Sequence, residues 1–364
     1  MRIAIVRLSS LGDVIVSASV LPFVKKHLEE IYPQRVEIDW IVDSTFSEVL
    51  YHSPCIDNLI EINLKKGGVN ALPTIIKNLK ALPVYDILID MQGLIKSALC
   101  GSMLKNKQYW GFAWDSIKEP LASLVYTYKV RIPYEQHILE RNLKLVCSAL
   151  GFKDIDETNR VYYHNRAEAF GVSEVDNVRV LEIFRAFEVD KDAKNIVLIL
   201  ESSLEAKTYP LHLFVQVIQQ LLETNPYLNV FLLWHSTNKA QKIKEHFASQ
   251  KNVVVLPRLH MGEIKALIQK VDLLIGGDTG ITHLAWAMQK DSITLYGNTP
   301  AARFALQGKN NRFLSGSENP SYAKNDFSIA NIQPNAICAC AEEILYGGSL
   351  HDNNAHSHLP HKDI

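Results

Sequence analysis

Short apolar runs alternate with amphipathic segments along almost the whole chain, and this alternation limits the possible folds more than any other feature of the sequence. The apolar runs are three to seven residues long, which suits strands buried on both faces of a sheet. Strands alternating with helices predict an α/β fold built on parallel sheets. The predicted strands are Ile3–Val6, Val36–Val42, Leu59–Ile62, Asp86–Asp90, Ile196–Leu200, Val230–Trp234, Val253–Leu256, Leu273–Ile275 and, as the final strand, Ile293–Tyr296. The predicted helices are Val14–Ile31, Leu72–Leu82, Arg141–Leu150, Leu211–Thr224, Ala240–Ala248, Met261–Val271, Ile281–Met288 and Pro334–Leu345.

The alternation is interrupted once, so we expect two parallel-sheet domains. A chain of 364 residues is too long for one ordinary core, and the segment 166–194 is more polar and less periodic than its surroundings. We predict a first domain at 1–165, a linker region at 166–194, a second domain at 195–330, a closing helix at 331–348 and a disordered tail at 349–364.

Composition and charge exclude several classes of protein. The formal net charge is −1, so no general positive field favours nucleic acid as a partner. The five cysteines are odd in number and scattered, and Cys338 and Cys340 lack the second pair that a zinc site needs, so we expect reduced thiols in the cytoplasm. No run reaches the roughly 18 apolar residues of a membrane span, so any membrane contact is expected to be peripheral.

The loop after the first strand is a candidate functional segment. The run Ser9–Asp13 leads into a helix and contains one glycine, Gly12, which argues against a dinucleotide-binding loop. Ligands of open parallel sheets bind at the carboxyl ends of the strands. Asp13 is therefore either an ordinary helix N-cap or a carboxylate that points into a cleft.

A second candidate segment, Gly276–His283, follows a strand and opens a helix. Its glycines expose backbone N–H groups at the positive end of the helix dipole, which favours a phosphate or diphosphate. Thr279 could add a hydroxyl donor, and His283 could reach the same anion from one turn into the helix. The alternative is a glycine-rich turn in which Asp278 caps the helix.

Two further loops follow predicted strands. Lys207 comes after the first strand of the second domain, where a lysine either pairs with a diphosphate or leaving group or is simply solvated. Gln92 and Gly93 follow a strand of the first domain and either line the floor of the cleft or form a plain turn. The sequence contains no Walker A loop, no H-E-x-x-H pair and no G-x-S-x-G elbow.

Taken together, these segments resemble the ADP-heptose:lipopolysaccharide heptosyltransferases over about residues 1–345. The run 118–123 is similar to heptosyltransferase I, the branch of this family that adds the first heptose to Kdo on lipid A. The matching segments are Ser9–Val14, Asp90–Ala98, Lys118–Ser123, Gln136–Arg141 and Gly277–Leu284.

The resemblance implies a GT-B fold, in which two Rossmann-like domains face each other across a cleft. The first domain would bind the acceptor, Kdo-lipid A, and the second would bind the donor, ADP-heptose. The resemblance also implies an inverting transfer that needs no metal and no cofactor. Such a protein would be cytoplasmic and peripherally associated with the cytoplasmic face of the inner membrane.

The resemblance also implies roles for individual residues. Asp13 would be the general base, and Lys207 would assist the donor phosphates or the leaving group. An inverting transfer needs both a base on the acceptor hydroxyl and positive charge on the departing diphosphate. The expected donor-binding residues are Ser202, Ser203, Asp278, Thr279, Gly280 and His283. The expected acceptor-binding residues are Ser10, Gly12, Gln92, Gly93, Lys96, Lys118 and Arg141.

The sequence departs from the family pattern at two places. After the Val230–Trp234 strand, the family tends to have a glycine and then a glutamate that can hold the nucleotide ribose, whereas this chain has the run His235–Lys239. After the last predicted strand, the family has Gly-Pro-Thr-Asp-Pro, whereas this chain reads Gly-Asn-Thr-Pro over Gly297–Pro300. Two alternatives stay open. The chain could be heptosyltransferase II or another transferase using ADP-heptose, or it could bind a sugar nucleotide without catalysis if Asp13 proved buried and satisfied.

Overall fold

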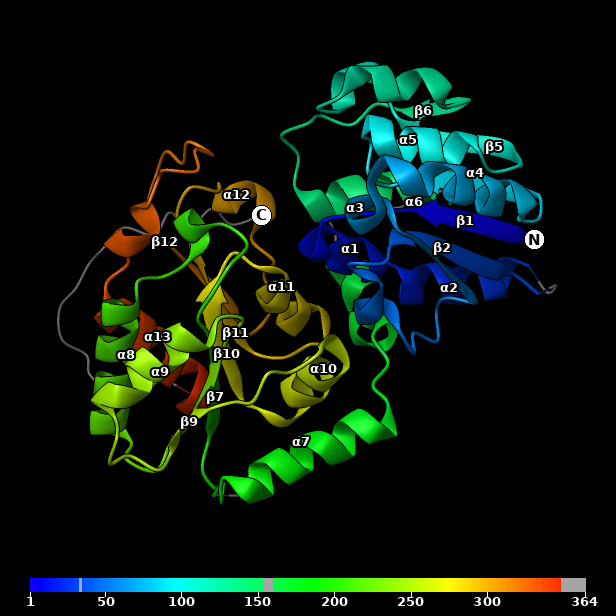
Figure 1. The fold of residues 1–364 in the computed structure, drawn as a ribbon. Coiled ribbons are helices and arrows are strands. Elements are labelled where there is room, and N and C mark those ends of the chain that lie inside the picture. The colour runs from blue at the N-terminus through cyan, green and yellow to red at the C-terminus, as the bar shows by residue number, and fades with distance from the viewer. Residues whose placement is uncertain (33–34, 153–159, 191, 348–364) are drawn as a thin grey trace.

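Two lobes, each built on one β-sheet, form the molecule (Figure 1). The computed structural model describes residues 1–32, 35–152, 160–190 and 192–347, so the expected tail at 349–364 lies outside the described residues. The first sheet contains β1 (Arg2–Val6), β2 (Glu37–Asp43), β3 (Asn58–Ile62), β4 (Tyr85–Asp90), β5 (Asn106–Phe112) and β6 (Tyr128–Val130). The second contains β7 (Asn195–Ile199), β8 (Asn229–Leu233), β9 (Val253–Val255), β10 (Leu273–Gly277), β11 (Ser292–Tyr296) and β12 (Asn311–Ser315).

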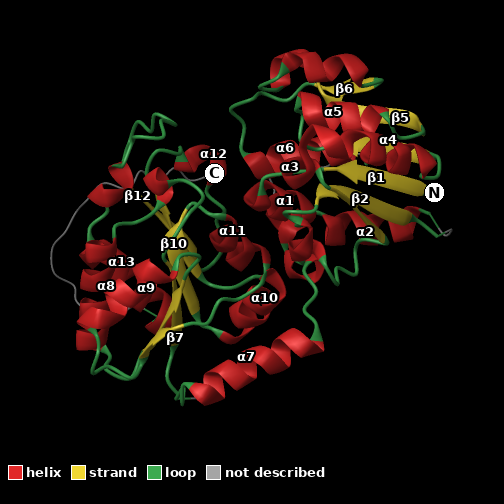
Figure 2. Cartoon of the chain, in the orientation of Figure 1, coloured by secondary structure: helices red, strands yellow, loops and turns green. Residues whose placement is uncertain are grey.

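Both sheets are parallel and are wound in the same order, which confirms the predicted pair of Rossmann-like sheets. Figure 2 shows the yellow strands of the two lobes among red helices. The order is β3-β2-β1-β4-β5-β6 in the first lobe and β12-β11-β10-β7-β8-β9 in the second. The winding reverses between β1 and β4 and again between β7 and β10. Ligands of such sheets bind outside the strand ends at this reversal, so the loops after these four strands are the expected site.

Helices cover both faces of each sheet. The α-helices of the first lobe are α1 (Leu11–Ala18), α2 (Leu21–Ile31), α3 (Leu64–Gly67), α4 (Leu72–Ala81), α5 (Ile95–Ser102) and α6 (Ile138–Leu150). The later α-helices are α7 (Glu174–Ala186), α8 (Leu211–Thr224), α9 (Thr237–His246), α10 (Met261–Lys270), α11 (Gly280–Ala287), α12 (Ala301–Phe304) and α13 (Pro334–Tyr346). Short 3₁₀ helices are η1 (Ser47–Leu50), η2 (Gly68–Ala71), η3 (Trp114–Ser116), η4 (Pro120–Val125), η5 (Arg160–Tyr163), η6 (Arg166–Ala169), η7 (Glu205–Lys207) and η8 (Ser328–Asn331).

Side chains of the central strands alternate between the two faces of each sheet. In β1, Ile3 and Ile5 join the core formed with α1, α2 and α6, whereas Ala4 and Val6 join the core formed with α4 and α5. Period-two alternation with both faces apolar is what a covered parallel sheet requires.

None of the described helices combines the length and the apolar character that crossing a bilayer requires.

Two secondary-structure predictions were wrong. The predicted helix Val14–Ile31 is two helices, α1 and α2, because Pro22 near the start of α2 cannot donate a backbone hydrogen bond to the preceding turn. The strand Ile293–Tyr296 is not the last, because the short edge strand β12 pairs with it. The expected linker region also contains a helix, α7, which packs against α10 along one side of the second lobe (Figure 1).

Direct contacts fix how the two lobes face each other. Lys265 of α10 is buried, and its ammonium group donates to the carbonyl oxygens of Tyr51 at 2.8 Å and Gly171 at 2.6 Å. On the same side, His260 Nδ1 lies 2.7 Å from the Glu48 carboxylate of η1. These contacts join the second lobe to the first lobe and to the segment before α7.

Candidate functional site

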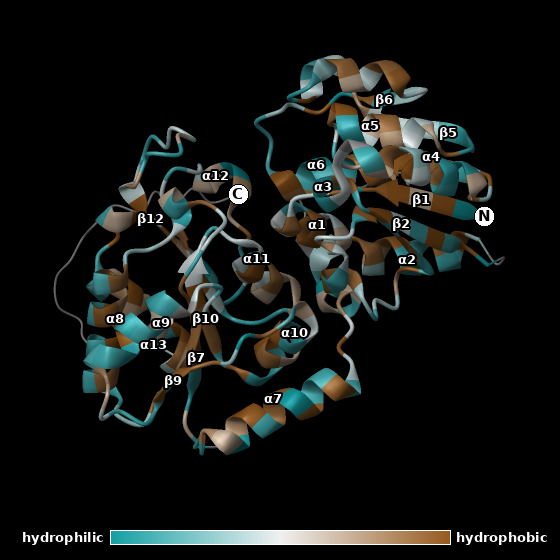
Figure 3. Cartoon of the chain, in the orientation of Figure 1, coloured by the Kyte–Doolittle hydropathy of each residue, from teal (hydrophilic) through white to brown (hydrophobic). Residues whose placement is uncertain are grey.

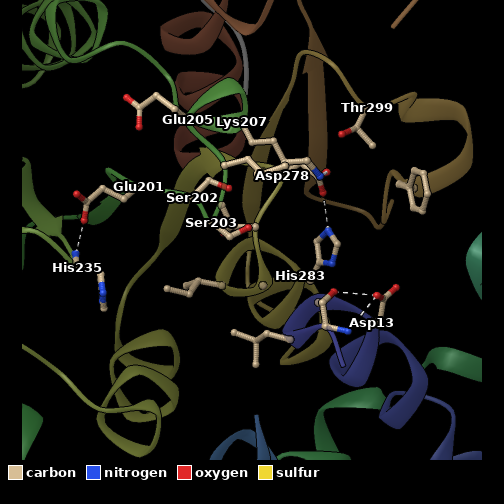
Figure 4. Close-up of a pocket in the computed structure, with 18 of the residues that line it drawn as sticks. Asp13, Glu201, Ser202, Ser203, Glu205, Lys207, His235, Asp278, His283 and Thr299 are labelled. Carbon is tan, nitrogen blue, oxygen red and sulfur yellow. Dashed lines mark hydrogen bonds and ion pairs between the residues drawn. The ribbon is translucent and has the colours of Figure 1, made fainter. Parts of the chain in front are cut away.

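A cavity of about 850 Å³ lies between the lobes, where the loops after β1, β7 and β10 meet (Figure 4). Three of the four loops at the winding reversals therefore contribute to one space, as the topology requires. Ten of the residues singled out from the sequence line it: Ser10, Gly12, Asp13, Ser202, Ser203, Lys207, Asp278, Thr279, Gly280 and His283.

Asp13 is held at the edge of this cavity by its own lobe. Ser10 is the N-cap of α1 and Asp13 is the third helical residue, so the interpretation of Asp13 as an ordinary N-cap was wrong. The Ser10 hydroxyl donates to Asp13 Oδ2 at 2.8 Å, and Arg7 Nη2 lies 2.8 Å from Oδ1. The carboxylate is only partly buried, and it borders two cavities, so acceptor positions on its oxygens remain open to a ligand.

Opposing effects act on the pKa of Asp13. Removal from water alone would raise the pKa, but the Arg7 guanidinium and the hydrogen bonds from Ser10 outweigh it and hold the pKa below its ordinary value. His283, across the lobe boundary, acts in the same direction. Asp13 is therefore a carboxylate at neutral pH and can accept a proton from a hydroxyl bound beside it.

Lys207, Asp278 and His283 form a charged network on the opposite wall of the cavity (Figure 4). Lys207 Nζ lies 2.5 Å from Asp278 Oδ2, and His283 Nε2 lies 3.0 Å from Asp278 Oδ1. Burial opposes the charge on Asp278, but the hydrogen bonds and charges of His283 and Lys207 dominate and lower its pKa well below the usual range. Asp278 thus fixes both nitrogen groups at the cavity wall.

The N-terminus of α11 adds to the positive potential at this wall. Thr279 is the N-cap of α11, and its hydroxyl accepts from the Thr282 backbone N–H, so the interpretation of Asp278 as the cap was wrong. The helix dipole therefore points its positive end into the cavity beside Lys207. Together the helix end and the lysine can bind a diphosphate.

Two glycines allow the lobes to approach closely at the cavity. A Cβ atom on Gly12 would lie 2.6 Å from His283 Nδ1, and a Cβ atom on Gly280 would lie 2.6 Å from the Leu11 side chain. Helices α1 and α11 pack closely at these two positions, where neither residue has a side chain. This packing brings Asp13 of the first lobe beside His283 of the second.

A second cavity, of about 380 Å³, continues from Asp13 into the first lobe. The expected acceptor residues Ser10, Gln92, Gly93, Lys118 and Arg141 line it. Buried Asp90 shapes the loop after β4, since its carboxylate accepts from the backbone N–H groups of Gln92 at 2.8 Å and Gly93 at 3.1 Å. The Gln92 side chain then bonds the loop after β1, accepting from Leu8 N and donating to Ser9 Oγ.

The three basic residues expected at the acceptor site differ in how they are used. Arg141 is buried, and its guanidinium donates to the backbone carbonyls of Ile132, Pro133 and Ser116, so it mainly supports the wall of the second cavity. Lys96 is exposed outside both cavities and donates to Ser9 Oγ at 2.8 Å. Lys118 is exposed at the cavity, where it is available to an anion.

The loop after β8, where the sequence departs from the family pattern, is fixed by a glutamate. The Glu201 carboxylate accepts from the backbone N–H groups of His235 at 2.5 Å and Ser236 at 2.6 Å. Lys239 pairs with both oxygens of Glu205 at 3.0 Å. The run 235–239 lacks the glutamate that the family pattern predicts there. Glu201 and Glu205 nevertheless line the larger cavity beside this run, so carboxylate acceptors are present there.

Sequence reasoning missed several residues of the site. Arg7 is the partner of Asp13, and its position directly after the first apolar run was the signal that could have identified it. Arg303 of α12 reaches across from the second lobe, with its guanidinium 3.8 Å from the ring centre of Tyr134. No periodic pattern in the sequence identifies such a pair.

Within the described part of the chain, no group of three or more His, Cys, Asp or Glu side chains is arranged to hold a metal ion.

The chain has clear relatives among known proteins. The family model described as glycosyltransferase family 9 (heptosyltransferase) matches residues 74–332. The chain is 32% identical to lipopolysaccharide heptosyltransferase 1 of Campylobacter coli, over 95% of this chain and 99% of the relative. It is 26% identical to lipopolysaccharide heptosyltransferase 1 of Escherichia coli K12, over 85% of this chain and 92% of the relative.

A solved structure shares the arrangement of both lobes. E. coli heptosyltransferase WaaC with ADP aligns with 94% of this chain and 99% of its own, with a TM-score of 0.75 and 23% sequence identity. The expected GT-B fold is confirmed by this likeness together with the two parallel sheets.

Proposed function

Because this chain belongs to glycosyltransferase family 9, the heptosyltransferases, we propose that it transfers L-glycero-D-manno-heptose from ADP-heptose to the Kdo of Kdo-lipid A. One observation carries the proposal: a carboxylate from the first lobe lines the same cavity as Lys207 and the N-terminus of α11 from the second. The relatives named heptosyltransferase 1 favour this first transfer over that of heptosyltransferase II.

The proposed reaction is a single displacement with inversion. The acceptor hydroxyl of Kdo forms a bond to the anomeric carbon of the heptose while the bond from that carbon to the diphosphate oxygen breaks. The proton of the hydroxyl passes to Asp13, whose ionised side chain borders both cavities. ADP departs against Lys207 and the N-terminus of α11, which offset the charge that develops on the diphosphate.

The two cavities divide the substrates in this proposal. ADP-heptose occupies the larger cavity, along the second lobe, and Kdo enters the smaller one beside Gln92, Gly93 and Lys118. No metal or cofactor takes part in this proposal, because Lys207 and the N-terminus of α11 supply the positive charge. Kdo-lipid A is a membrane lipid, so the enzyme would reach it by peripheral contact at the cytoplasmic face of the inner membrane.

Turnover with defined substrates tests the proposal. The chain is incubated with Kdo-lipid A and ADP-heptose, and parallel reactions replace the donor with UDP- or GDP-sugars. We expect heptosylated product only with ADP-heptose, in the presence of EDTA as well as in its absence. The absence of product with ADP-heptose, combined with intact ADP binding, would favour the non-catalytic alternative instead.

We expect Asp278→Ala and His283→Ala each to weaken ADP binding by about tenfold, which corresponds to about 1.4 kcal/mol. Without Asp278, Lys207 and His283 lose the anion that holds them at the cavity wall. Calorimetry with ADP measures the change, and the KM for the acceptor should stay constant. Asp272→Ala, which removes a carboxylate paired with Lys194 elsewhere in the lobe, is the matched control. Unchanged ADP affinity in both site variants would contradict the placement of the diphosphate.

We expect the double variant Lys96→Ala/Lys118→Ala to raise the acceptor KM several-fold at low salt without changing the donor KM. Kdo carries a carboxylate, and exposed lysines attract it through a field that salt screens. Initial rates at low and high salt measure the effect. Lys77→Ala/Lys80→Ala removes two exposed lysines from α4, away from both cavities, and serves as the control. Equal acceptor KM values for all three proteins would place the acceptor elsewhere.

A further inference from the structure

Four large apolar side chains face water along one edge of the first lobe. Ile95 and Leu99, one turn apart on α5, are 38% and 49% exposed. Leu121 and Leu124, one turn apart on η4, are 58% and 65% exposed. Side chains at these spacings share one face of an α-helix and of a 3₁₀ helix, respectively. We call these four residues the apolar edge; Figure 3 shows the brown ribbons of this region beside β6.

The two halves of the apolar edge form one surface. Glu119, at the start of η4, accepts a hydrogen bond from the backbone N–H of Ile95 at 2.8 Å, so the N-termini of η4 and α5 are tied together. Helices α5 and η4 also pack directly against each other. Trp114 of the neighbouring η3 is 51% exposed and adds an aromatic ring of the kind that settles at a membrane–water interface.

The apolar edge lies in a basic part of an otherwise neutral chain. Residues 91–132 contain six basic and two acidic side chains, a net charge of +4, whereas the whole chain carries −1. One of the two acidic side chains, Glu119, is engaged with α5, and the other, Asp115, pairs with Arg131. Apolar side chains beside lysines are the combination that binds an anionic lipid surface.

Another exposed apolar row provides the contrast. Val175 and Val178 on α7 are 78% and 45% exposed, yet that helix carries three acidic and two basic residues. An anionic surface would repel it slightly. Charge therefore distinguishes the apolar edge from an ordinary exposed row.

The apolar edge is also continuous with the smaller cavity. Leu94, Ile117 and Lys118 line that cavity, and the chain passes directly from Leu94 to Ile95 and from Lys118 through Glu119 to η4. A lipid held against the edge would therefore present its sugar headgroup at the cavity that ends at Asp13. A second copy of the chain, by contrast, would gain nothing from this continuity.

We infer that the apolar edge, with the lysines around it, docks the protein onto an anionic lipid bilayer and inserts Leu121 and Leu124 among the headgroups. The choice of a lipid partner rests on the proposed function, which it deepens by assigning the surface that faces the membrane. The bound orientation keeps the smaller cavity at the bilayer surface and the second lobe farther from it.

Flotation of the full chain with vesicles tests the inference without any need for turnover. The vesicles are phosphatidylcholine alone or phosphatidylcholine with phosphatidylglycerol. We expect binding to the mixed vesicles, weakened by salt, and a loss of about tenfold or more in Leu121→Glu/Leu124→Glu. Leu121→Ser/Leu124→Ser should lose binding to a smaller extent. Val175→Glu/Val178→Glu, with the same charge change at the same spacing on α7, should bind like the parent.

Activity separates this inference from the proposed function. Transfer to a lipid-free Kdo acceptor should be equal in the parent and the Leu121→Glu/Leu124→Glu variant, whereas transfer to Kdo-lipid A in vesicles should fall in the variant. Vesicle binding by that variant equal to the parent's, or no binding by the parent, would overturn the inference. A parent dimer that this variant converts to monomer would instead assign the edge to a second copy. Absence of transfer to the lipid-free acceptor by the parent would contradict the proposed function alone.

Discussion

Asp13→Asn is expected to lower kcat by about 100- to 10,000-fold while ADP binds almost as tightly as to the parent. The amide keeps the shape of the side chain, and its one oxygen can still accept a hydrogen bond from either Ser10 or Arg7, but it cannot take the acceptor proton. Single-turnover kinetics measures the chemical step, and calorimetry measures ADP affinity. Normal turnover in this variant would exclude Asp13 as the base.

Asp86→Asn is a closely matched control for this change. The Asp86 side chain is 35% exposed and pairs with Lys107 at 2.7 Å, whereas Asp13 is 36% exposed and pairs with Arg7 at 2.8 Å. Both substitutions therefore neutralise a half-buried carboxylate in an ion pair, but only one lies at the cavity. An equal loss of activity in both variants would indicate a general effect on the fold.

The pH dependence gives a second readout of Asp13. Its pKa lies below the ordinary value, mainly because Arg7 and Ser10 overcome the effect of burial, so the carboxylate persists as the pH falls toward about 4. The fraction in the basic form then declines as the pH drops further, through the lowered pKa. We expect no loss of kcat/KM from Asp13 between neutral pH and about pH 5, and Arg7→Met should move any acid limb to higher pH.

Most of the fold followed from apolar periodicity, and what was missed has a physical explanation. Buried central strands such as β1 and β7 are continuous apolar runs, which is why they were predictable. The edge strands β6 and β12 have one neighbour each and contain polar residues, so no such run marks them. Helix α7 was missed because Val175 and Val178 face water, which weakens the apolar periodicity of its buried face.

The site could be predicted to the level of loops but not of contacts. The winding order alone places the loops after β1, β4, β7 and β10 at the reversals, and these loops contain most of the residues that line the two cavities. Side-chain partners depend on packing between distant segments. Arg141, for example, looks from the sequence like a free cation, yet three backbone carbonyls occupy its guanidinium.

Lys207→Met is expected to lower kcat by about 100- to 1,000-fold, the typical effect of removing one preorganised group from a developing negative charge. Lys207 is the side-chain cation nearest to Asp278, and it lies beside the N-terminus of α11, where the departing diphosphate is proposed to bind. Lys207→Arg keeps the charge with a different geometry and should recover part of the rate. Lys194→Met, which breaks the ion pair with Asp272 in the same lobe, controls for the loss of a lysine.

A double variant separates two causes of that loss. Lys207→Met leaves the buried Asp278 carboxylate with His283 as its remaining side-chain partner, and a buried carboxylate that has lost its lysine could distort the cavity by itself. Lys207→Met/Asp278→Asn removes both charges, so a distortion caused by the carboxylate would be relieved and the rate would recover. If the missing positive charge at the diphosphate is the cause, the double variant stays as slow as Lys207→Met. We expect the second result, and recovery of the parent rate would limit Lys207 to a structural role as the partner of Asp278.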